Sequence, residues 1–296
     1  MSESAKYCFI INCASNAYSS EGLFRRHENL IRNKFPDSEI RYIHSEDSIQ
    51  GYVNDNLNNF SHFIACGGDG TVNQVANSLA DKDKIMGVIP LGSGNDFAKN
   101  IGLNADFGHN LSVLIKDKVK KIDAIQANQE LFVNTYGIGV DGLTNYYASK
   151  SKFRSGFLKY FIAGLRALLQ ADRFDVEVTI DESSLVKLDS IWMFAVANGK
   201  TEGGRYKISP YSDNGDGVAE IVIVNDISRL RLIIEFIKLS FGVPFNQKVV
   251  DVLEFTRILK VHTSKELRAH SDGEQLGTHN RFSFQMEKAC LSVIVK

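Results

Sequence analysis

The sequence predicts an α/β protein: a domain with a doubly wound, mostly parallel sheet, followed by a larger, β-sandwich-like second domain. Three observations carry this prediction. The chain has 296 residues, which is long for one ordinary domain. Over the first 125 residues, apolar strand-like runs alternate with helical periodicity, as in a parallel sheet covered by helices. From about residue 120 onward, strand-like runs mostly follow one another, which is typical of an antiparallel domain.

The elements of the first domain follow from the spacing of apolar residues. Compact runs rich in strand formers predict buried strands, and apolar residues three and four apart predict helices. Strands are expected at 7–12, 39–44, 61–66 and 84–90, and helices at 21–35, 47–59, 72–80 and 95–101. We expect this domain to span residues 1–125, with the C-terminal segment 285–296 returning to complete it.

The second domain is expected to span residues 126–284. A long helical stretch at 142–171 interrupts its strands, and a second helix is expected at 229–245. The expected strands lie at 119–128, 131–139, 174–181, 188–199, 217–224, 249–255 and 258–263.

Composition excludes several classes of protein. The net charge of −1 argues against a nucleic-acid binder, whose phosphate contacts require a basic surface. The four cysteines form no C-x-x-C pair, which indicates reduced, buried thiols. The first residues lack a signal-peptide pattern, and charges interrupt the most apolar later stretch, 230–245. These features predict a cytoplasmic protein.

The most informative stretch is FIACGGDGTVNQVANSLA, residues 63–80, in which a strand runs into the glycine loop 67–71 and then into a helix. Unpaired amides at a helix start, the helix dipole and the close approach that glycine permits together suit a phosphate. Thr71 is expected to cap the helix with its hydroxyl. A carboxylate in such a site, Asp69, is explained if Mg²⁺ stands between it and the phosphates.

A second loop of the same kind follows in VIPLGSGNDFAKN, residues 88–100. It again joins a strand to a helix through glycines, Gly92 and Gly94, and it carries a cap candidate, Asn95, and a carboxylate, Asp96. Loops at the carboxyl ends of neighbouring parallel strands can face one cleft. Neither of these two loops has the G-x-x-x-x-G-K-[ST] pattern or the G-x-G-x-x-G pattern.

GGDGTVN followed by PLGSGNDFA resembles the catalytic domain of the diacylglycerol kinase and sphingosine kinase superfamily, above all the soluble bacterial lipid kinases. Further segments match in order: IINCASN (10–16), NTYGIGVDG (134–142), the glycine-rich block 196–224 and SDGEQL (271–276). The resemblance implies transfer of the γ-phosphate of ATP to a lipid hydroxyl, in phospholipid metabolism. It also implies an active site in the cleft between an α/β nucleotide domain and a larger β-rich domain.

The resemblance also implies roles for residues of the first domain. Asp69 and Asp96 would act through Mg²⁺ and its waters. The residues that would contact the nucleotide are Gly67, Gly68, Gly70 and Thr71 in the first glycine loop, Gly94 and Asn95 in the second, and Asn12 and Ser15 beside them.

In the second domain, Asp272 would be the general base that takes the proton of the acceptor hydroxyl. If the segment is extended, Glu274 points the same way and would touch the nucleotide or the metal network. On composition alone, SDGEQLG is a surface hairpin turn. The related kinases hold a structural Mg²⁺ in the region of SDNGDG (212–217), where Asp216 would supply a carboxylate, assisted by the carbonyls of Asp213 and Val218. An Asp-rich turn without metal is an equal alternative.

The lipid leaves no spacing signature, so diacylglycerol, a sphingoid base and phosphatidylglycerol are all compatible with the sequence. The helix FLKYFIAGLRALLQ (157–170) suits transient contact with an anionic membrane surface, although packing of its apolar stripe on the second domain is the favoured interpretation. A homodimer is also compatible with the sequence. The alternatives in function are an NAD kinase-like enzyme, a non-catalytic nucleotide-binding protein and a structural protein with incidental glycine loops.

Overall fold

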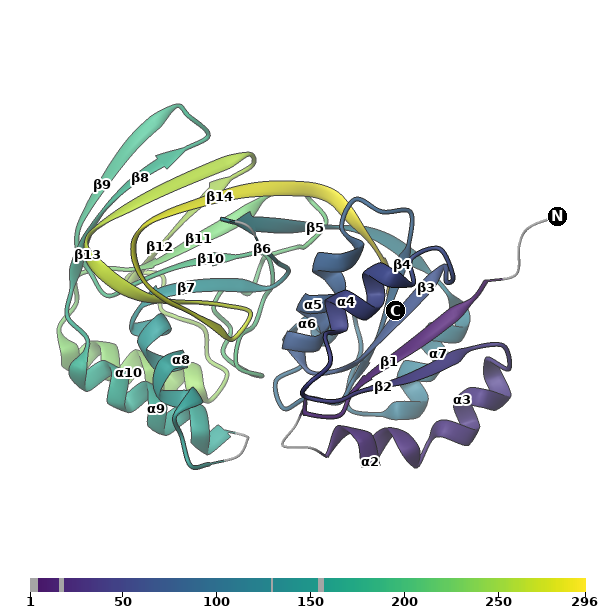
Figure 1. The fold of residues 1–296 in the computed structure, drawn as a ribbon. Helices are drawn as coiled ribbons and strands as arrows, with labels where there is room; N and C mark the ends of the chain where they lie inside the picture. The colour runs from purple at the N-terminus through teal and green to yellow at the C-terminus, as the bar shows by residue number, and fades with distance from the viewer. Residues whose placement is uncertain (1–4, 16–18, 129, 154–156) are drawn as a thin grey trace. The chain divides into compact units, whose positions relative to one another are not determined.

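The computed structural model describes residues 5–15, 19–128, 130–153 and 157–296 (Figure 1). The chain divides into two compact units. Unit 1 contains residues 1–122 and 289–296, and unit 2 contains residues 123–288. The last strand therefore belongs to both units, and its final residues complete unit 1.

Unit 1 is built on a parallel sheet with the strand order β14-β4-β3-β1-β2. The central strand β3 is buried along its whole length, as expected for a strand covered on both faces. The strands are β1 (Tyr7–Asn12), β2 (Glu39–Ile43), β3 (His62–Gly67), β4 (Ile85–Pro90) and the end of β14 (Glu274–Ile294). Each of the four predicted strands of this unit is present.

Among the described residues of unit 1, six helices connect these strands or follow them. Strand β5 (Val119–Ala127) then crosses into unit 2. The helix predicted over 21–35 is two helices, because the chain breaks at His27, whose ring stacks on Phe107. The helix that contains Phe107 was not predicted. The helices are α2 (Ser20–Arg25), α3 (Glu28–Lys34), α4 (Ile49–Asp55), α5 (Asp69–Leu79), α6 (Asp96–Asn100) and α7 (Phe107–Lys116).

Unit 2 is built on antiparallel strands in the order β12-β11-β10-β7-β13-β14. Strand β8 pairs with β13 and with β9, and β6 pairs with β5. The bounds are β6 (Glu130–Phe132), β7 (Thr135–Gly139), β8 (Phe174–Ile180), β9 (Ser184–Ile191), β10 (Met193–Ala197), β11 (Ala219–Val224), β12 (Val250–Phe255) and β13 (Ile258–Ser271). The predicted antiparallel character of this unit is confirmed.

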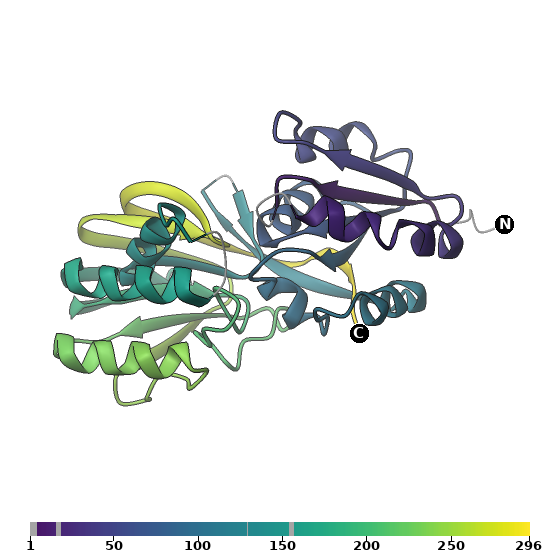
Figure 2. The ribbon, with the colours of Figure 1, turned by 90° about the horizontal axis from the view of Figure 1, so that it is seen from below.

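The helices of unit 2 are α8 (Val140–Ser149), α9 (Phe157–Gln170) and α10 (Arg229–Ser240). The single long helix predicted over 142–171 is thus two helices, and residues 154–156 between them lie outside the described part of the chain. Helices α9 and α10 lie side by side (Figure 2). Within the described residues, no helix is both long enough and apolar enough to cross a bilayer.

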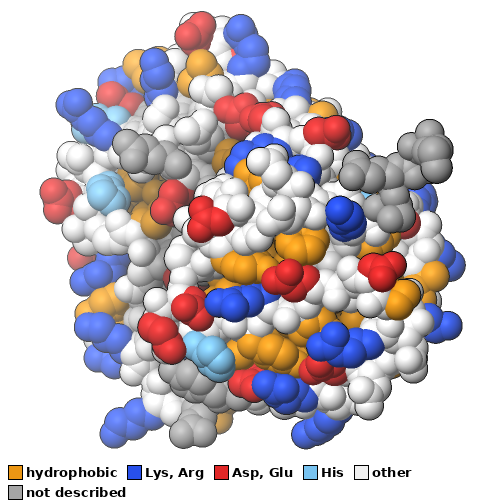
Figure 3. All heavy atoms as spheres, turned by 45° about the vertical axis from the view of Figure 1, so that its right-hand side comes forward, with side chains coloured by type: hydrophobic (Ala, Val, Ile, Leu, Met, Phe, Trp, Pro, Cys, Tyr) orange, Lys and Arg blue, Asp and Glu red, His pale blue; other side chains and the backbone are white. Residues whose placement is uncertain are grey.

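On the face shown in Figure 3, acidic and basic side chains are interspersed over the surface. This agrees with the net charge of −1. All four cysteines are buried and free, as the sequence predicted.

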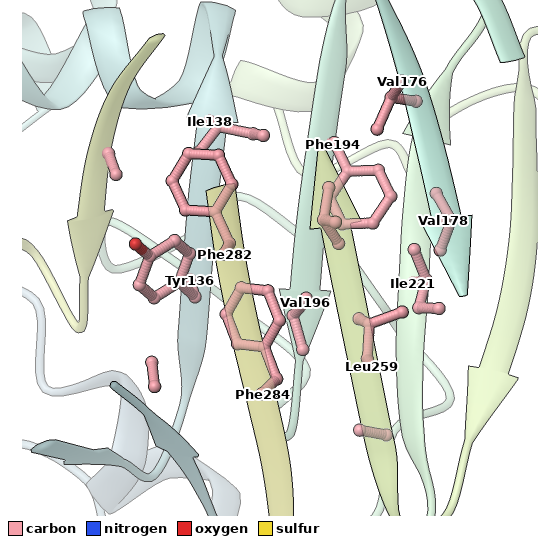
Figure 4. Packing of buried hydrophobic residues seen from close by; sticks show 14 of the residues in the cluster. Tyr136, Ile138, Val176, Val178, Phe194, Val196, Ile221, Leu259, Phe282 and Phe284 are labelled. Atoms are coloured by element: carbon pink, nitrogen blue, oxygen red, sulfur yellow. The ribbon is translucent and has the colours of Figure 1, made fainter. Parts of the chain in front are cut away.

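The core of unit 2 lies between its strands and is rich in aromatic rings (Figure 4). The rings of Tyr136 on β7 and Phe284 on β14 meet edge to face, with centroids 4.9 Å apart. Val176 and Val178 on β8 close the same cluster, so strands from distant parts of the sequence share one core. A second cluster beneath the helices includes Leu168, Trp192 and Phe236.

Candidate active site

The first glycine loop of unit 1 follows directly from the end of β3. Gly68 is the N-cap residue of the eleven-residue helix α5. Because glycine has no side chain, no N-cap side chain covers the first backbone amides of this helix. A Cβ on Gly67 would lie 2.3 Å from Thr71 Oγ1, which excludes any larger residue. The loop therefore has the features of a phosphate site: helix amides, dipole and close backbone approach.

The second glycine loop packs against the first. The backbone N–H of Leu91 donates to the carbonyl of Gly67 at 2.8 Å. A Cβ on Gly92 would lie 2.4 Å from the Cα of Gly68, so the two backbones meet where both residues are glycine. The two loops are thus brought together within unit 1, as their positions after adjacent parallel strands predicted.

Asn95 fixes the shape of the second loop. It adopts a left-handed backbone conformation with φ 55°, and its side chain both accepts from the N–H of Gly92 (2.9 Å) and donates to the Gly92 carbonyl (2.8 Å). Gly94 accepts a hydrogen bond from Lys99 Nζ at 2.7 Å. The same ammonium lies 3.8 Å from the carboxylate of Asp96, which is buried in the first turn of α6.

Asp69 connects the two loops. Its Oδ1 accepts the backbone N–H of Phe97 at 3.1 Å, so a residue of the first loop satisfies an open amide of the second helix. The carboxylates of Asp69 and Asp96 are therefore both held at the junction of the loops. Hard carboxylate oxygens beside a phosphate site form the donor set that Mg²⁺ prefers.

The residues after β1 contact the same loops. Thr71 does not cap α5 as predicted; its buried hydroxyl instead accepts a hydrogen bond from Asn12 Nδ2 at 3.0 Å. Ser15 Oγ lies 2.5 Å from Ser20 Oγ, and Ser20 Oγ donates to the carbonyl of Leu91 at 3.2 Å. Asn12 and Ser15 are thereby linked to both glycine loops, whereas residue 16 of the IINCASN segment lies outside the described residues.

In unit 2, Asp272 and Gly273 form the two-residue turn between β13 and β14. Both have positive φ, 47° and 87°, as the turn type of a two-residue hairpin requires. The segment is therefore not extended at Asp272, so the condition under which Glu274 was expected to point the same way is not met. Glu274 is exposed at the start of β14.

The Asp272 carboxylate is held by backbone. Oδ2 accepts the N–H of Val133 at 2.9 Å, and Oδ1 accepts those of Asn134 and Thr135 at 3.0 and 2.9 Å. The N–H of Asp272 in turn donates to the Thr135 carbonyl at 2.8 Å. These bonds orient the carboxylate and tie the hairpin turn to the segment that leads into β7.

The 212–218 loop is organised around a residue that the sequence analysis did not single out. The carboxylate of buried Asp123 accepts the N–H of Gly217 at 2.7 Å, and the backbone N–H of Asp123 donates to the Asn214 carbonyl at 2.7 Å. Asp216 Oδ1 accepts the N–H of Val218 at 3.0 Å, and Asp213 is exposed. The signal for Asp123 was an acidic residue inside an apolar strand. Carboxylates and carbonyls around this loop fit a hard cation.

Unit 2 also contains an apolar pocket of about 60 Å³ beneath its helices. Its walls come from Met193, Leu232 and Phe236, and its polar members include Asp141 and Glu202. Both carboxylates lie 3.1 Å from Nε2 of His270, which is fully buried. The local sequence does not show that these three residues meet, because they lie far apart along the chain.

Comparison with known proteins places this chain in a family. The model of the diacylglycerol kinase catalytic domain matches residues 6–127. The model of the YegS C-terminal NAD kinase beta sandwich-like domain matches residues 134–295. The chain therefore belongs to the diacylglycerol kinase family, with a second domain of the YegS type, and the resemblance stated from its motifs is confirmed.

Individual relatives agree with this assignment. The diacylglycerol kinase of Bacillus subtilis (strain 168) is 29% identical over 275 residues, which cover 88% of each chain. The diacylglycerol kinase of Staphylococcus aureus (strain Newman) is 25% identical over 267 residues, 84% of this chain and 83% of the relative. A crystal structure described as a diacylglycerol kinase from Bacillus anthracis strain Sterne has a TM-score of 0.75 at 20% identity and covers 100% of this chain and 98% of that chain. This likeness confirms the predicted fold class.

Proposed function

We propose that this protein is an ATP-dependent lipid kinase that transfers the γ-phosphate of ATP to a hydroxyl of a lipid such as diacylglycerol. Membership of a kinase family gives the general class. The observation that carries the finer proposal is the packing of the two glycine loops, in which Gly68 and Gly92 meet backbone to backbone beside the carboxylates of Asp69 and Asp96.

In this proposal the amides of residues 67–71 and 92–96 bind the nucleotide phosphates. Asn12 and Ser15 hold the loops in shape, because Asn12 bonds Thr71 and Ser15 contacts the serine that bonds Leu91. Asp69 and Asp96 would hold Mg²⁺, which when bound neutralises charge on the phosphate oxygens. Asp272 would accept the proton of the lipid hydroxyl, with Glu274 nearby, and its three backbone hydrogen bonds would keep the carboxylate oriented.

The 212–218 loop would hold a second, structural Mg²⁺. The donors in this part of the proposal are the carboxylate of Asp216 and the carbonyls of Asp213 and Val218. Buried Asp123 supports it, because its carboxylate fixes the loop through Gly217.

Transient contact with a membrane is the last part of the proposal. The predicted stripe of α9 packs on unit 2, since Gly164 and Leu168 are buried, but two other rows face outward. They carry exposed apolar side chains at helical spacings of three, four and seven residues, namely Leu158, Ile162 and Leu169 on α9 and Leu230, Ile234, Ile237 and Phe241 along α10. Lys159, Arg166 and Lys238 stand on the same helices, so an anionic bilayer is the occupant that fits.

The deciding experiment incubates purified protein with labelled ATP, Mg²⁺ and a panel of lipids in mixed micelles, with NAD as a soluble acceptor in a parallel sample. Label in a lipid supports the proposal. Label in NAD alone would replace it with the NAD kinase-like alternative. Stabilisation by Mg·ATP without transfer to any acceptor would leave a nucleotide-binding protein.

The nucleotide site is tested by Gly92→Ala. The new methyl would meet the Gly68 backbone at 2.4 Å, so the loops must separate, and we expect Mg·ATP affinity to fall roughly tenfold or more. Gly22→Ala on α2 is the matched control, because no atom lies within 4 Å of the methyl it adds. Equal affinities in the two variants would argue against the loops as the nucleotide site.

The membrane surface is tested by Leu230→Gln with Phe241→Gln. Each loses apolar area that a bilayer would bury, about 1.5–3 kcal/mol per side chain, so sedimentation with anionic vesicles should drop at least tenfold. Leu185→Gln on β9 is a control of similar exposure away from these helices. Unchanged sedimentation of the double variant would remove α10 from the proposed surface.

A further inference from the structure

Three side chains from separate elements of unit 2 meet at one buried point. His270 lies on β13, Asp141 in the first turn of α8, and Glu202 in the connection between β10 and β11. Nε2 of His270 lies 3.1 Å from Asp141 Oδ2 and 3.1 Å from Glu202 Oε1. One ligand atom from each residue lies within 4.8 Å of the other two. The cluster is not used by the proposed phosphoryl transfer.

These contacts are ion-pair contacts with poor hydrogen-bond geometry. Among the described residues, neither ring nitrogen of His270 nor Oδ2 of Asp141 has a hydrogen-bond partner of acceptable geometry, although His270 is fully buried. A ring N–H can point at one acceptor, whereas Nε2 stands equally far from two carboxylate oxygens. An imidazolium would bury two poorly satisfied N–H groups here, and a ring that coordinates a cation through Nε2 would bury one.

The charge around the ring favours a cation. Burial alone would lower the pKa of His270, but Glu202 and Asp141 outweigh burial and raise that pKa well above its ordinary value. The same two carboxylates attract any positive charge. A proton on His270 leaves the buried cluster with a net charge of −1, whereas a divalent cation with a neutral ring leaves it neutral.

The backbone beside the cluster is shaped to leave room for these atoms. Gly137 on β7 pairs with His270 on β13. A Cβ on Gly137 would lie 1.9 Å from Asp141 Oδ2 and 2.6 Å from His270 Nε2. Behind Asp141, a Cβ on Gly142 would lie 2.0 Å from the carbonyl of Arg268, so α8 is pressed against β13. The donors are therefore held by rigid elements, as a metal site requires.

We propose that His270, Asp141 and Glu202 bind a divalent transition-metal ion of the zinc class. One imidazole nitrogen and two carboxylate oxygens are ligands that Zn²⁺ and Mn²⁺ accept, and an imidazole distinguishes this site from those of Mg²⁺. The ion ties β13, α8 and the 202–206 turn together at the polar end of the apolar pocket. This site goes beyond the proposed kinase function and does not depend on it.

The experiment measures bound metal directly. The full chain is stripped with chelator, loaded with Zn²⁺ or, separately, Mn²⁺, desalted, and analysed for metal content and thermal stability. We expect one tightly bound ion per chain after desalting. In melting curves with free metal added to a hundredfold excess over Kd, we expect a rise in Tm of roughly 5–10 °C. Loading with Co²⁺ should give visible absorption bands that report nitrogen and oxygen ligands.

Two variants locate the ion. His270→Gln and Glu202→Gln should each lose the bound ion and the Co²⁺ bands, and Glu202→Gln serves if His270→Gln fails to fold. His262→Gln changes an exposed histidine of the same strand and should keep the ion. Asp216→Asn should also keep it, because the 212–218 loop is a different site.

The proposal is overturned if the wild-type chain binds no stoichiometric Zn²⁺ or Mn²⁺, or if Glu202→Gln binds as well as wild type. Its failure is distinguishable from failure of the kinase proposal. Metal content is read without substrate, and lipid phosphorylation with added Mg²⁺ is read on chelator-treated protein.

Discussion

Two hairpin turns of unit 2 hold an aspartate in almost the same way. In the β13–β14 turn, Asp272 accepts the N–H groups of three consecutive residues, 133–135, and donates to the carbonyl of the third. In the β8–β9 turn, Asp181 accepts the N–H groups of residues 256–258 at 2.8–3.0 Å and donates to the carbonyl of the third. Both residues have φ 47°.

Because it occurs twice, this arrangement is a structural device. It attaches a tight turn to a neighbouring segment, and the same pattern of aspartate-to-backbone hydrogen bonds arises twice in one unit. The three hydrogen bonds of Asp272 are therefore no evidence of catalysis by themselves. What separates the two turns is the sequence around them, because only Asp272 stands in a segment, SDGEQL, that resembles a kinase motif.

The largest expected difference between the turns is in turnover. Asp272→Asn removes the proposed base, so lipid phosphorylation per folded molecule should fall by about 10²-fold or more while Mg·ATP binding survives. Asp181→Asn makes the same chemical change in the matched turn and should alter turnover less than twofold. The measurement is initial rate in mixed micelles, with the folded fraction checked by circular dichroism. Similar rates in the two variants would remove the base role from Asp272.

The comparison also separates what could be predicted from the sequence from what could not. The glycine loops at 67–71 and 92–96 could be predicted, because each is contiguous and its chemistry belongs to its own backbone. The attachment of Asp272 to residues 133–135 could not, since its partners lie more than a hundred residues away and are backbone groups without a side-chain signature.

The same reason explains the other omissions. Asp123 organises the 212–218 loop from a distant strand, and the cluster of His270, Asp141 and Glu202 forms only when three elements pack. The break at His27 is not visible in the local periodicity of apolar residues, and the stacking of its ring on Phe107 is a tertiary contact. Resemblance to a family supplied the proposed role of Asp272, and the fold supplied its partners.

In stability, by contrast, the two turns should behave alike. An asparagine side chain has one acceptor oxygen where aspartate has two, because its other terminal atom is an NH₂ donor. Asp272→Asn and Asp181→Asn therefore each leave backbone amides unsatisfied. We expect each to cost about 1–3 kcal/mol in the free energy of unfolding, measured by urea denaturation at pH 7. A loss confined to one variant would show that the two arrangements differ in strength.

The pH dependence of stability should distinguish Asp181→Asn from the wild type. Burial alone would raise the pKa of Asp181, but the N–H groups of Ile258, Thr256 and Arg257 and the Thr256 hydroxyl outweigh it and hold that pKa below its ordinary value. Because the folded pKa is depressed, this carboxylate stabilises the fold above its unfolded pKa of about 3.9, and the contribution disappears as pH falls through the folded pKa. Urea midpoints measured between pH 7 and pH 3 should therefore fall less steeply in Asp181→Asn than in wild type.

The smallest expected effects lie at the second residue of each turn, where the two differ in sequence. The β13–β14 turn has Gly273 at φ 87°, whereas the β8–β9 turn has Glu182 at φ 63°. A side chain in this region strains the backbone, so Gly273→Ala should destabilise by about 1 kcal/mol and Glu182→Gly should stabilise by up to about 1 kcal/mol. The new Cβ of Gly273→Ala would not be crowded, because the nearest atom to it would be Asn145 Nδ2 at 3.9 Å. Shifts of the same sign in paired Tm measurements would mean that contacts of Glu182, and not backbone strain, decide the stability of that turn.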